Sequence, residues 1–219
     1  MQRRHIDLIN SLVHQDIIKD ERIKNVMIAT DRVDFTTDRV YDDTPQSIGY
    51  NVTISAPHMH AYALEMLRDK LVPGARVLDV GSGSGYLTVC MARLVQPNGK
   101  AIGIEHISQL VDLSLKNIAK NNQSLIDDGT LEIVLGDGRL GYLQGGPYDA
   151  IHVGAAASDR PIELIEQLKP GGRLVVPVGI GSQRMMTYEK SLDSKEIHEQ
   201  ATLNVRYVPL TDKDKQWNH

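Results

Sequence analysis

Apolar residues recur at helical spacing along the first part of the chain, which predicts helices over residues 5–31. The next stretch, residues 32–55, has few apolar residues in register and contains one proline and one glycine. We therefore expect a loop-rich segment there, of the kind that often carries function. Pro57 then precedes another helical run, expected from His60 to Leu71.

From Arg76 onward, short apolar runs alternate with amphipathic ones, which predicts a doubly wound α/β sheet. Ser108 is a candidate helix cap, and Lys169-Pro170-Gly171-Gly172 is expected to end the last helix. The expected strands are Arg76–Val80, Ala101–Glu105, Leu131–Leu135, Asp149–Val153 and Leu174–Val178, with Met185–Lys190 and Leu203–Val208 as later, antiparallel ones. The expected helices are Tyr86–Leu94, Ser108–Asn121 and Pro161–Leu168.

The composition is that of an ordinary globular chain, with 41% apolar and 24% charged residues over 219 positions. A formal charge of −4, without a basic stripe, disfavours a nucleic-acid partner. The single cysteine, Cys90, excludes an internal disulfide, and its apolar surroundings predict a buried thiol. We find no secretory signal and no run approaching the roughly 18 apolar residues of a membrane span. A soluble, cytosolic protein is therefore expected.

A glycine-rich turn, Asp79-Val80-Gly81-Ser82-Gly83-Ser84-Gly85, lies directly after the first of these strands and before a helix. Glycines there permit positive φ and let the backbone approach a ligand, while the helix N-terminus offers N–H groups. The spacing differs from the G-x-G-x-x-G of dinucleotide sites, because bulky Tyr86 occupies the third position. A ligand without phosphates, such as S-adenosylmethionine, fits better. The spacing by itself is also compatible with a tight turn that binds nothing.

Two acidic residues follow the next two strands. Glu105 ends the second strand, about twenty residues past the turn, where an acid accepts hydrogen bonds from both ribose hydroxyls. Asp137 follows the third strand and suits an adenine amino group. Either acid alone is equally well a solvated loop residue. Because ligands of open α/β sheets bind at the carboxyl ends of the strands, their joint position favours a nucleoside site.

Several further stretches match a single known pattern. They are Pro45–Gly49, Thr53-Ile54-Ser55-Ala56-Pro57-His58-Met59-His60-Ala61, Asp79–Gly85, Gly136–Arg139, Tyr148–Ala156, Leu168–Leu174 and Tyr207–Thr211. With these motifs the chain resembles the protein-L-isoaspartate (D-aspartate) O-methyltransferases, a family of protein-repair enzymes. The glycine turn is common to many methyltransferases, so the narrower segment from Ile54 to Ala61 carries the assignment.

The resemblance implies a three-layer αβα, Rossmann-like methyltransferase fold around a central mixed, mostly parallel sheet. It implies one domain over 1–219: N-terminal helices and a substrate segment (1–72), a cofactor-binding core (73–180), and C-terminal strands with a closing tail (181–219). The implied reaction moves a methyl group from S-adenosylmethionine to the α-carboxylate of L-isoaspartyl residues, or to the side-chain carboxylate of D-aspartyl residues. The implied products are S-adenosylhomocysteine and an ester that returns to aspartate through a succinimide. The implied partners are damaged proteins and peptides, with no membrane or nucleic acid, and the enzyme is expected to be a monomer.

The resemblance also implies residue roles. Ser55 matches the active-site serine, Glu105 and His106 match ribose contacts, and Asp137 and Gly138 match adenine contacts. The full set of cofactor residues that it implies is Thr53, Ile54, His60, Asp79, Gly81, Ser82, Gly83, Glu105, His106, Asp137, Gly138, Thr211 and Gln216. Residues 50–52 and 158–160 lie where the family varies, which leaves the fine peptide preference open.

The chemistry demands little of the site. An α-carboxyl group, with a pKa of about 3.5, is ionised at neutral pH, so no general base is needed. The site must align the reacting atoms and remove water without leaving the carboxylate unpaired. Ser55 supplies a neutral donor; the alternative from spacing is that it caps the following helix. An extended substrate could also pair with main chain from residues 48–54 or 207–210.

Rival interpretations remain at this stage. No metal is expected, because His58 and His60 are two residues apart and would not share a helix face. A methyltransferase acting on a small molecule or RNA would use the same glycine turn and acids. An inactive cofactor-binding or chaperone-like module would bind without turnover.

Overall fold

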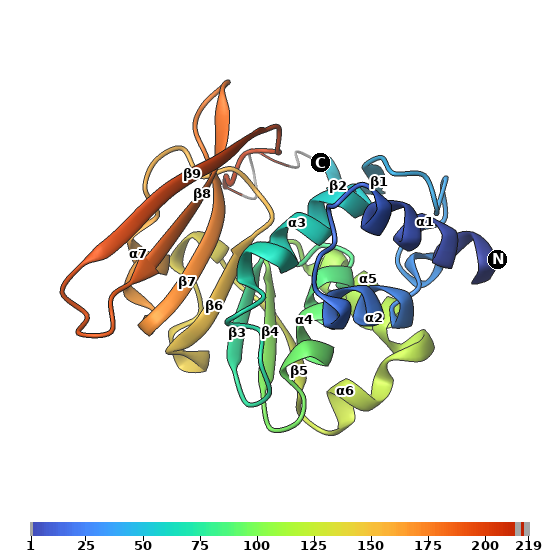
Figure 1. The fold of residues 1–219 in the computed structure, drawn as a ribbon, viewed down its shortest axis with the longest axis horizontal. Helices are drawn as coiled ribbons and strands as arrows, with labels where there is room; N and C mark the ends of the chain where they lie inside the picture. The colour runs from blue at the N-terminus through green and yellow to red at the C-terminus, as the bar shows by residue number, and fades with distance from the viewer. Residues whose placement is uncertain (1, 213–215, 217–219) are drawn as a thin grey trace.

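The computed structural model describes residues 2–212 and 216, and its centre is a seven-stranded sheet in the order β5-β4-β3-β6-β7-β8-β9 (Figure 1). The strands from β3 to β7 pair in parallel, whereas β8 and β9 are antiparallel. The strands are β3 Arg76–Val80, β4 Lys100–Glu105, β5 Leu131–Leu135, β6 Tyr148–Val153, β7 Leu168–Val178, β8 Gln183–Lys190 and β9 Ile197–Val205. A separate hairpin consists of β1 Gln46–Gly49 and β2 Val52–Ile54.

Helices cover the sheet on both faces, because the central strands are apolar on both sides. Along β3, Val77 packs into one hydrophobic core while Leu78 and Val80 pack into the other. The first core holds α1 to α4 against the sheet, and the second holds α7. The helices are α1 Gln2–His14, α2 Glu21–Ala29, α3 Pro57–Leu67, α4 Tyr86–Val95, α5 Ser108–Asn121, α6 Gln123–Asp127 and α7 Ile162–Glu166, with 3₁₀ turns η1 Arg32–Asp34, η2 Gly138–Leu140 and η3 Leu143–Gly145. The predicted α/β fold with a mixed, mostly parallel sheet is confirmed.

The loop expected over residues 32–55 contains more structure than its pattern predicts. It includes the turn η1 and the hairpin β1–β2. The two residues between the hairpin strands, Tyr50 and Asn51, both have positive φ (55° and 56°). Such a turn usually carries Asn-Gly or Asp-Gly. Tyr-Asn gives a much weaker signal, and strands of four and three residues are too short for alternation to be read.

Several predicted boundaries were wrong. Ser108 does not cap α5: Ile107 occupies the N-cap position, and no side chain caps the helix. The helix expected over Pro161–Leu168 is shorter, because β7 already begins at Leu168 and the Lys-Pro-Gly-Gly sequence lies within that strand. The last strand, expected over Leu203–Val208, begins at Ile197 and ends at Val205.

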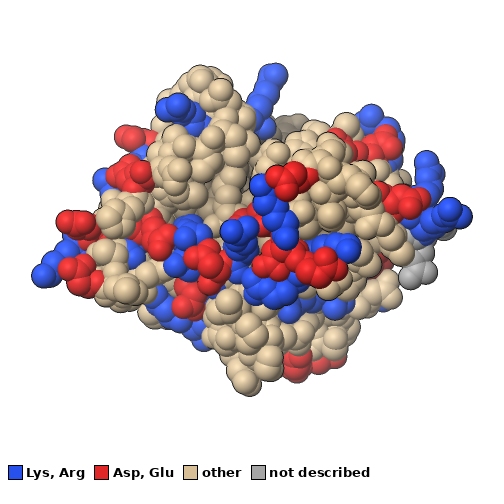
Figure 2. All heavy atoms as spheres, viewed as in Figure 1, with Lys and Arg blue, Asp and Glu red and all other residues tan. Residues whose placement is uncertain are grey.

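On the face shown in Figure 2, acidic and basic side chains lie intermixed, and neither sign dominates. Within the described residues, no helix is long and apolar enough to cross a membrane. Cys90 is fully buried, as predicted, and its burial raises the thiol pKa to about 12.

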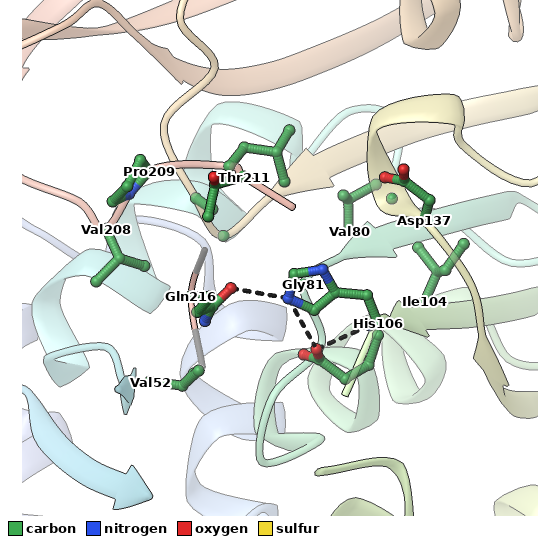
Figure 3. A pocket seen from close by; sticks show the side chains of 15 residues that line it. Val52, Val80, Gly81, Ile104, His106, Asp137, Val208, Pro209, Thr211 and Gln216 are labelled. Carbon is green, nitrogen blue, oxygen red and sulfur yellow. Dashed lines mark hydrogen bonds and ion pairs between the residues drawn. The ribbon is translucent and has the colours of Figure 1, made fainter. Parts of the chain in front are cut away.

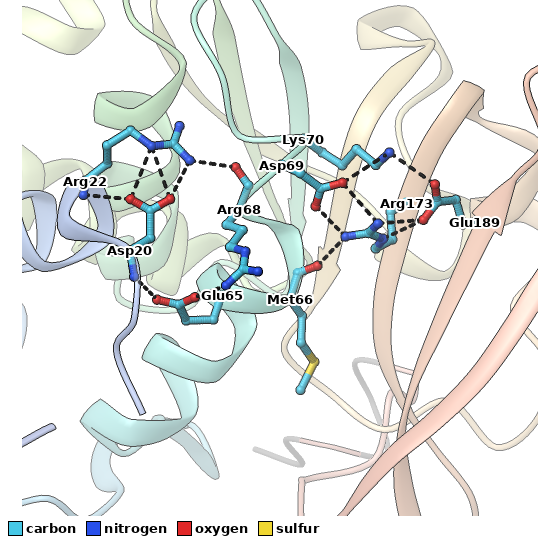
Figure 4. A network of polar contacts seen from close by, with 9 residues as sticks. All are labelled: Asp20, Arg22, Glu65, Met66, Arg68, Asp69, Lys70, Arg173 and Glu189. Atoms are coloured by element: carbon cyan, nitrogen blue, oxygen red, sulfur yellow. Dashed lines mark hydrogen bonds and ion pairs between the residues drawn. The ribbon is translucent and has the colours of Figure 1, made fainter. Parts of the chain in front are cut away.

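A polar network joins the end of α3 to β7 and β8 (Figure 4). The Arg173 guanidinium donates to Asp69 Oδ1 at 2.5 Å, to Glu189 Oε2 at 2.6 Å and to the carbonyl of Met66 at 2.7 Å. Lys70 Nζ also donates to Glu189, at 3.1 Å. Arg173 therefore donates hydrogen bonds to two carboxylates and to the end of a helix at the same time, and its side chain is only 20% exposed.

We expect Arg173→Met to lower the free energy of unfolding by about 1–3 kcal/mol, because two carboxylates and a carbonyl lose a half-buried donor. Chemical denaturation at neutral pH measures this loss. The matched control is Arg68→Met, whose pair with Glu65 involves an arginine side chain that is 52% exposed, so that a change below about 0.5 kcal/mol is expected. Equal effects for the two variants would contradict the assignment.

The loss of stability in Arg173→Met is expected to depend on pH. Burial acts to raise the pKa of Asp69 and Glu189, but hydrogen bonds and charge from Arg173 and Lys70 outweigh it and leave both pKa values lowered. A carboxyl with a lowered pKa stabilises the fold above its unfolded pKa and loses that contribution as pH falls through the folded value. The gap between wild type and Arg173→Met should therefore be constant near neutrality and shrink below about pH 4.

Candidate active site

The glycine turn opens space at the carboxyl end of β3. Gly81, Gly83 and Gly85 have φ values of 74°, 50° and 87°, a region that side chains rarely adopt. The chain can therefore reverse within a few residues and begin α4 at Tyr86, whose ring is buried. The strand ends consequently face an open crevice instead of a helix.

Glu105, at the end of β4, is fixed by backbone donors from two loops. Its carboxylate accepts N–H groups from Gly83 at 3.1 Å, His106 at 2.8 Å and Ile107 at 3.1 Å. Oε1 takes two of these bonds and Oε2 takes one, so that Oε2 keeps acceptor capacity. The side chain is nearly buried, which holds this negative charge at one position beside the crevice.

Asp137 lies across the crevice, and its carboxylate is already hydrogen-bonded within the protein. Arg139 binds it through its backbone N–H and guanidinium, with Nη2 at 2.6 Å from Oδ2. Hydrogen bonds from Arg139 lower the pKa of Asp137, so the carboxyl stays charged. Arg139 Nη2 also lies 2.7 Å from Asp212 Oδ1 and thereby ties the C-terminal segment to this loop.

These residues surround a first chamber, drawn in Figure 3. It is closed on one side by the C-terminal segment, where His106 Nε2 lies 2.8 Å from Gln216 Oε1. Asn51 donates to the Gln216 carbonyl at 2.9 Å. The lining residues are Val52, Val80, Gly81, Ile104, Glu105, His106, Asp137, Gly138, Gly154, Ala155, Val208, Pro209, Leu210, Thr211 and Gln216.

A second chamber continues past the glycine turn. Here the buried Asp79 carboxylate accepts from Thr88 Oγ1 at 2.6 Å and lies 2.8 Å from His152 Nδ1. Ser82 Oγ is buried and has no hydrogen-bond partner among the described residues. The lining residues are Val52, Thr53, Ile54, Ser55, His60, Asp79, Gly81, Ser82, Gly83, Ser84, Leu87, His152, Gly154 and Val208.

An outer groove, open to the surface, meets the second chamber. Gly154 and Val208 line both chambers and the groove, so the three spaces converge there. Ser55 and Thr53 line both the second chamber and the groove. The groove is lined by Pro45, Thr53, Ser55, Ala56, His58, Met59, Gly154, Asn204, Val205, Arg206, Tyr207 and Val208.

The structure brings all the predicted site residues to these connected spaces. It also answers whether Ser55 caps the following helix. The N-cap residue of α3 is Ala56, which has no capping side chain, and the N–H of His58 in the first turn donates to Asp43 at 2.9 Å. The capping role of Ser55 was therefore wrong. Among the described residues, no group of three or more His, Cys, Asp or Glu side chains is arranged to hold a metal ion.

Sequence reasoning missed three residues that line or secure the site: His152, Gly154 and Arg139. His152 was assigned no role, although it lies one residue before the end of β6, in direct register with Asp79 on β3. That strand-end position is the signal that could have found it. Gly154 follows two residues later, directly after the strand, and a Cβ there would lie 3.1 Å from the Gly81 carbonyl.

The fold and site together define a class. A glycine turn after β3, a fixed acid after β4 and a chamber at the carboxyl ends of the strands are the features of an S-adenosylmethionine-dependent methyltransferase. The unpartnered Ser82 hydroxyl and the space beside Asp79 fit the charged tail of this cofactor, so the residues present suit it.

Comparison with known proteins identifies the family. The family model described as Protein-L-isoaspartate(D-aspartate) O-methyltransferase (PCMT) matches residues 3–215. Protein-L-isoaspartate O-methyltransferase 1 of Arabidopsis thaliana is 50% identical over 212 residues, which is 95% of this chain and 92% of that protein. The enzyme of Caenorhabditis elegans is 48% identical, covering 97% of this chain and 94% of its own.

A solved structure agrees with this. The protein-L-isoaspartate O-methyltransferase of Plasmodium falciparum, in complex with S-adenosyl-L-homocysteine, is 36% identical with a TM-score of 0.88, over 94% of this chain and 98% of that one. The chain belongs to the protein-L-isoaspartate(D-aspartate) O-methyltransferase family. It is an S-adenosylmethionine-dependent enzyme that methylates isoaspartyl residues for protein repair, and the alternatives of a small-molecule or RNA substrate fall away.

The exposed pairs of Arg139 give a test of how the C-terminal segment closes the first chamber. We expect Arg139→Met to raise the Kd of S-adenosylhomocysteine about two- to fivefold at low salt, because Asp212 loses its ion pair with Arg139 and the segment opens more readily. At about 1 M salt, where the Debye length is roughly 3 Å, the difference from wild type should largely vanish. Calorimetric titration at both salt concentrations measures it.

Arg160→Met is the matched control. Arg160 forms a similarly exposed pair with Glu199, at 3.0 Å, and lines neither chamber. Its Kd should match wild type at every salt concentration. A loss of affinity in Arg139→Met that persists unchanged at high salt would contradict the electrostatic closure.

Proposed function

We propose that Ser55 positions the substrate carboxylate where the second chamber meets the outer groove. One observation carries this assignment: Ser55 lines both spaces, and its earlier alternative role as a helix cap is excluded. A carboxylate held there has the chamber on one side and the groove, with room for the rest of a peptide, on the other. The hydroxyl donates one hydrogen bond and adds no permanent charge.

The neutrality of this donor matters for the reaction. The substrate carboxylate is anionic and becomes a neutral ester, so a strong fixed cation against it would stabilise the starting state more than the transition state. A hydroxyl aligns the nucleophilic oxygen and offsets part of its desolvation while leaving it reactive. No general base takes part, since the carboxyl is already ionised.

We assign the cofactor to the two chambers. S-adenosylmethionine supplies the methyl group when it is bound. In the first chamber Glu105 and His106 suit the ribose, Asp137 and Gly138 suit the adenine, and Thr211 and Gln216 cover it. The residues assigned to the methionine tail in the second chamber are Thr53, Ile54, His60, Asp79, Gly81, Ser82 and Gly83.

The outer groove is the proposed site for an extended peptide with an L-isoaspartyl or D-aspartyl residue. Strand pairing at residues 207–210 is disfavoured, because several main-chain groups there are already engaged. Gln183 binds the Tyr207 N–H at 2.6 Å and its carbonyl at 3.0 Å, and Ala156 pairs with Val208 and Leu210. Pairing along β2, which leads directly into Ser55, is favoured instead.

We further propose that the enzyme acts as a monomer in the cytosol on damaged proteins. Residues of a single chain line both chambers and the groove, which supports a complete site in one copy. The buried thiol of Cys90 is compatible with that compartment.

The Ser55→Ala variant tests the central assignment. We expect kcat/KM for an isoaspartyl peptide to fall about ten- to hundredfold, the usual effect of losing a hydrogen bond to a charged group. The Kd of S-adenosylhomocysteine should stay within about twofold, since the cofactor contacts lie elsewhere in the chambers. A radiolabelled methyl-transfer assay and calorimetry measure the two quantities.

Ser47→Ala is the control, because Ser47 pairs with Thr53 in the same hairpin but lines neither chamber nor the groove. It should retain the wild-type rate. If Ser55→Ala also retained the wild-type rate, the carboxylate would have to be positioned by another group and the assignment would fail.

A further inference from the structure

A buried arginine lies directly behind the second chamber. The Arg32 side chain is 0% exposed, and its Nη1 donates to the Ser55 carbonyl at 3.2 Å and lies 3.4 Å from His60 Nδ1. Its Nε donates to the Val40 carbonyl at 3.3 Å. The residue was given no role from sequence, because it lies in a stretch without a distinctive motif.

The fold holds this arginine in place from both ends of η1. Asp31 accepts the Val33 N–H at 3.1 Å and starts the turn. At the other end, Asn121 on α5 donates to the Asp34 carboxylate at 2.9 Å, and Lys120 donates to the Asp34 carbonyl. The turn is therefore fixed to α5, and the arginine cannot swing toward solvent without breaking these contacts.

The charge of Arg32 is not neutralised by a direct ion pair. No ion pair joins it to a carboxylate among the described residues, and its Nη2 has no hydrogen-bond partner there. Its guanidinium instead lies 5.5 Å from the centre of the Tyr86 ring. Burial lowers its pKa, yet an arginine stays protonated in a protein. The Asp43 carboxylate acts on Arg32 from beyond ion-pair distance and is itself bound by His58. A desolvated cation without a direct ion pair is unfavourable for stability, which points to another use.

The neighbouring histidine shows what that use is. His60 packs on the same Tyr86 ring, with ring centres 4.8 Å apart. Burial first, and then the charge of Arg32, hold the pKa of His60 well below its ordinary value, so the imidazole is neutral. A guanidinium only donates hydrogen bonds, so the nitrogen facing it, Nδ1, must carry the lone pair. The single proton therefore resides on Nε2, which has no partner among the described residues.

We propose that Arg32 is a positioning residue that fixes His60 as an Nε2–H donor to a carboxylate in the second chamber. The inference rests on the proposed function, which brings two carboxylates to this chamber: that of the methionine tail and that of the isoaspartyl residue. Without the arginine, the proton can move to Nδ1 and leave a lone pair facing the anion.

The opposite arrangement of the chamber's other histidine supports this assignment. The buried Asp79 carboxylate only accepts, so His152 Nδ1 carries a proton and donates to it. Each imidazole of the chamber is thus oriented through its Nδ1 by a buried neighbour, Arg32 for His60 and Asp79 for His152.

Nitrogen-15 NMR of histidine-labelled protein tests the tautomer without turnover. In the wild type, His60 should carry its proton on Nε2 over the pH range in which the protein is folded and this imidazole is neutral. Arg32→Met should shift the proton to Nδ1 or to a mixture of both sites. The control is Arg76→Met, since the Arg76 guanidinium likewise binds main chain, with two hydrogen bonds to the Gly145 carbonyl, but lies away from the chambers. It should leave the His60 signals unchanged.

A double-mutant cycle tests the consequence for catalysis. Arg32→Met should lower kcat/KM about ten- to hundredfold in the wild-type background. In a His60→Gln background the amide offers an N–H at a similar place without a tautomer to fix, so the same change should cost less than about threefold. A rise in the Kd of S-adenosylhomocysteine would assign the donor to the methionine tail; a rise in peptide KM at constant Kd would assign it to the isoaspartyl group.

The inference is overturned if His60 keeps its Nε2 proton in Arg32→Met, or if the loss is equal in both backgrounds. If Arg32→Met does not fold, Arg32→Lys replaces it: the ammonium still donates to Nδ1, so the Nε2 proton should persist with kcat/KM within tenfold of wild type, and a proton on Nδ1 would refute the proposal. Ser55→Ala, assayed in parallel, separates this failure from failure of the proposed function, which would leave that variant fully active.

Discussion

The contact between the ends of β3 and β6 is the constraint from which the rest of the site follows. The sheet order reverses here: β4 and β5 lie on one side of β3, and β6 and β7 lie on the other. Neighbouring loops therefore leave in opposite directions and open a crevice. Asp79 and His152 join the two strands across it, at 2.8 Å. The Gly154 N–H then donates to the Val80 carbonyl at 2.8 Å, and a Cβ at this position would lie only 3.1 Å from the Gly81 carbonyl.

The site promotes methyl transfer by positioning the two reacting groups. A carboxylate and a sulfonium are both reactive at neutral pH, and they need alignment in a dry space more than they need proton transfer. The chambers are built accordingly. Charged groups such as Asp79 and Glu105 are each held by several donors, whereas the groups offered at the junction with the groove are neutral. Such a site holds an anion without suppressing its nucleophilicity.

The parts of this site that are local in sequence could be predicted. Glycine spacing, an acid at the end of a strand and the Ile54–Ala61 segment each lie within a few residues, so their meaning could be inferred directly. What could not be predicted depends on the direction of side chains and on contacts between distant residues. The role of Arg32 needs His60 and Ser55, which lie more than twenty residues away, and Asp137 is bound by Arg139, a neighbour whose direction no pattern gives.

Much of the fold could be predicted for the same reason, and the errors in the predicted elements have the same origin. Parallel strands buried on both faces give continuous apolar runs, so β3, β4, β5 and β6 were located to within one residue, whereas β7 begins six residues before its predicted start. The hairpin β1–β2 was missed because its turn, Tyr50-Asn51, lacks the glycine that marks such turns. The Lys-Pro-Gly-Gly sequence suggested a stop, but it lies inside β7, where Gly171 takes a positive φ of 75°. The strand pairs with β6 at Leu168 and again from Arg173, so these four residues form an irregularity within β7 and do not end it.

The most direct test of the account is methyl transfer from labelled S-adenosylmethionine to a pair of peptides that differ only at one residue, L-isoaspartyl in one and L-aspartyl in the other. The account predicts base-labile label in the isoaspartyl peptide, approaching one methyl group per residue when the ester is trapped at low pH, and background label in its aspartyl twin. Equal labelling of the two peptides would contradict it.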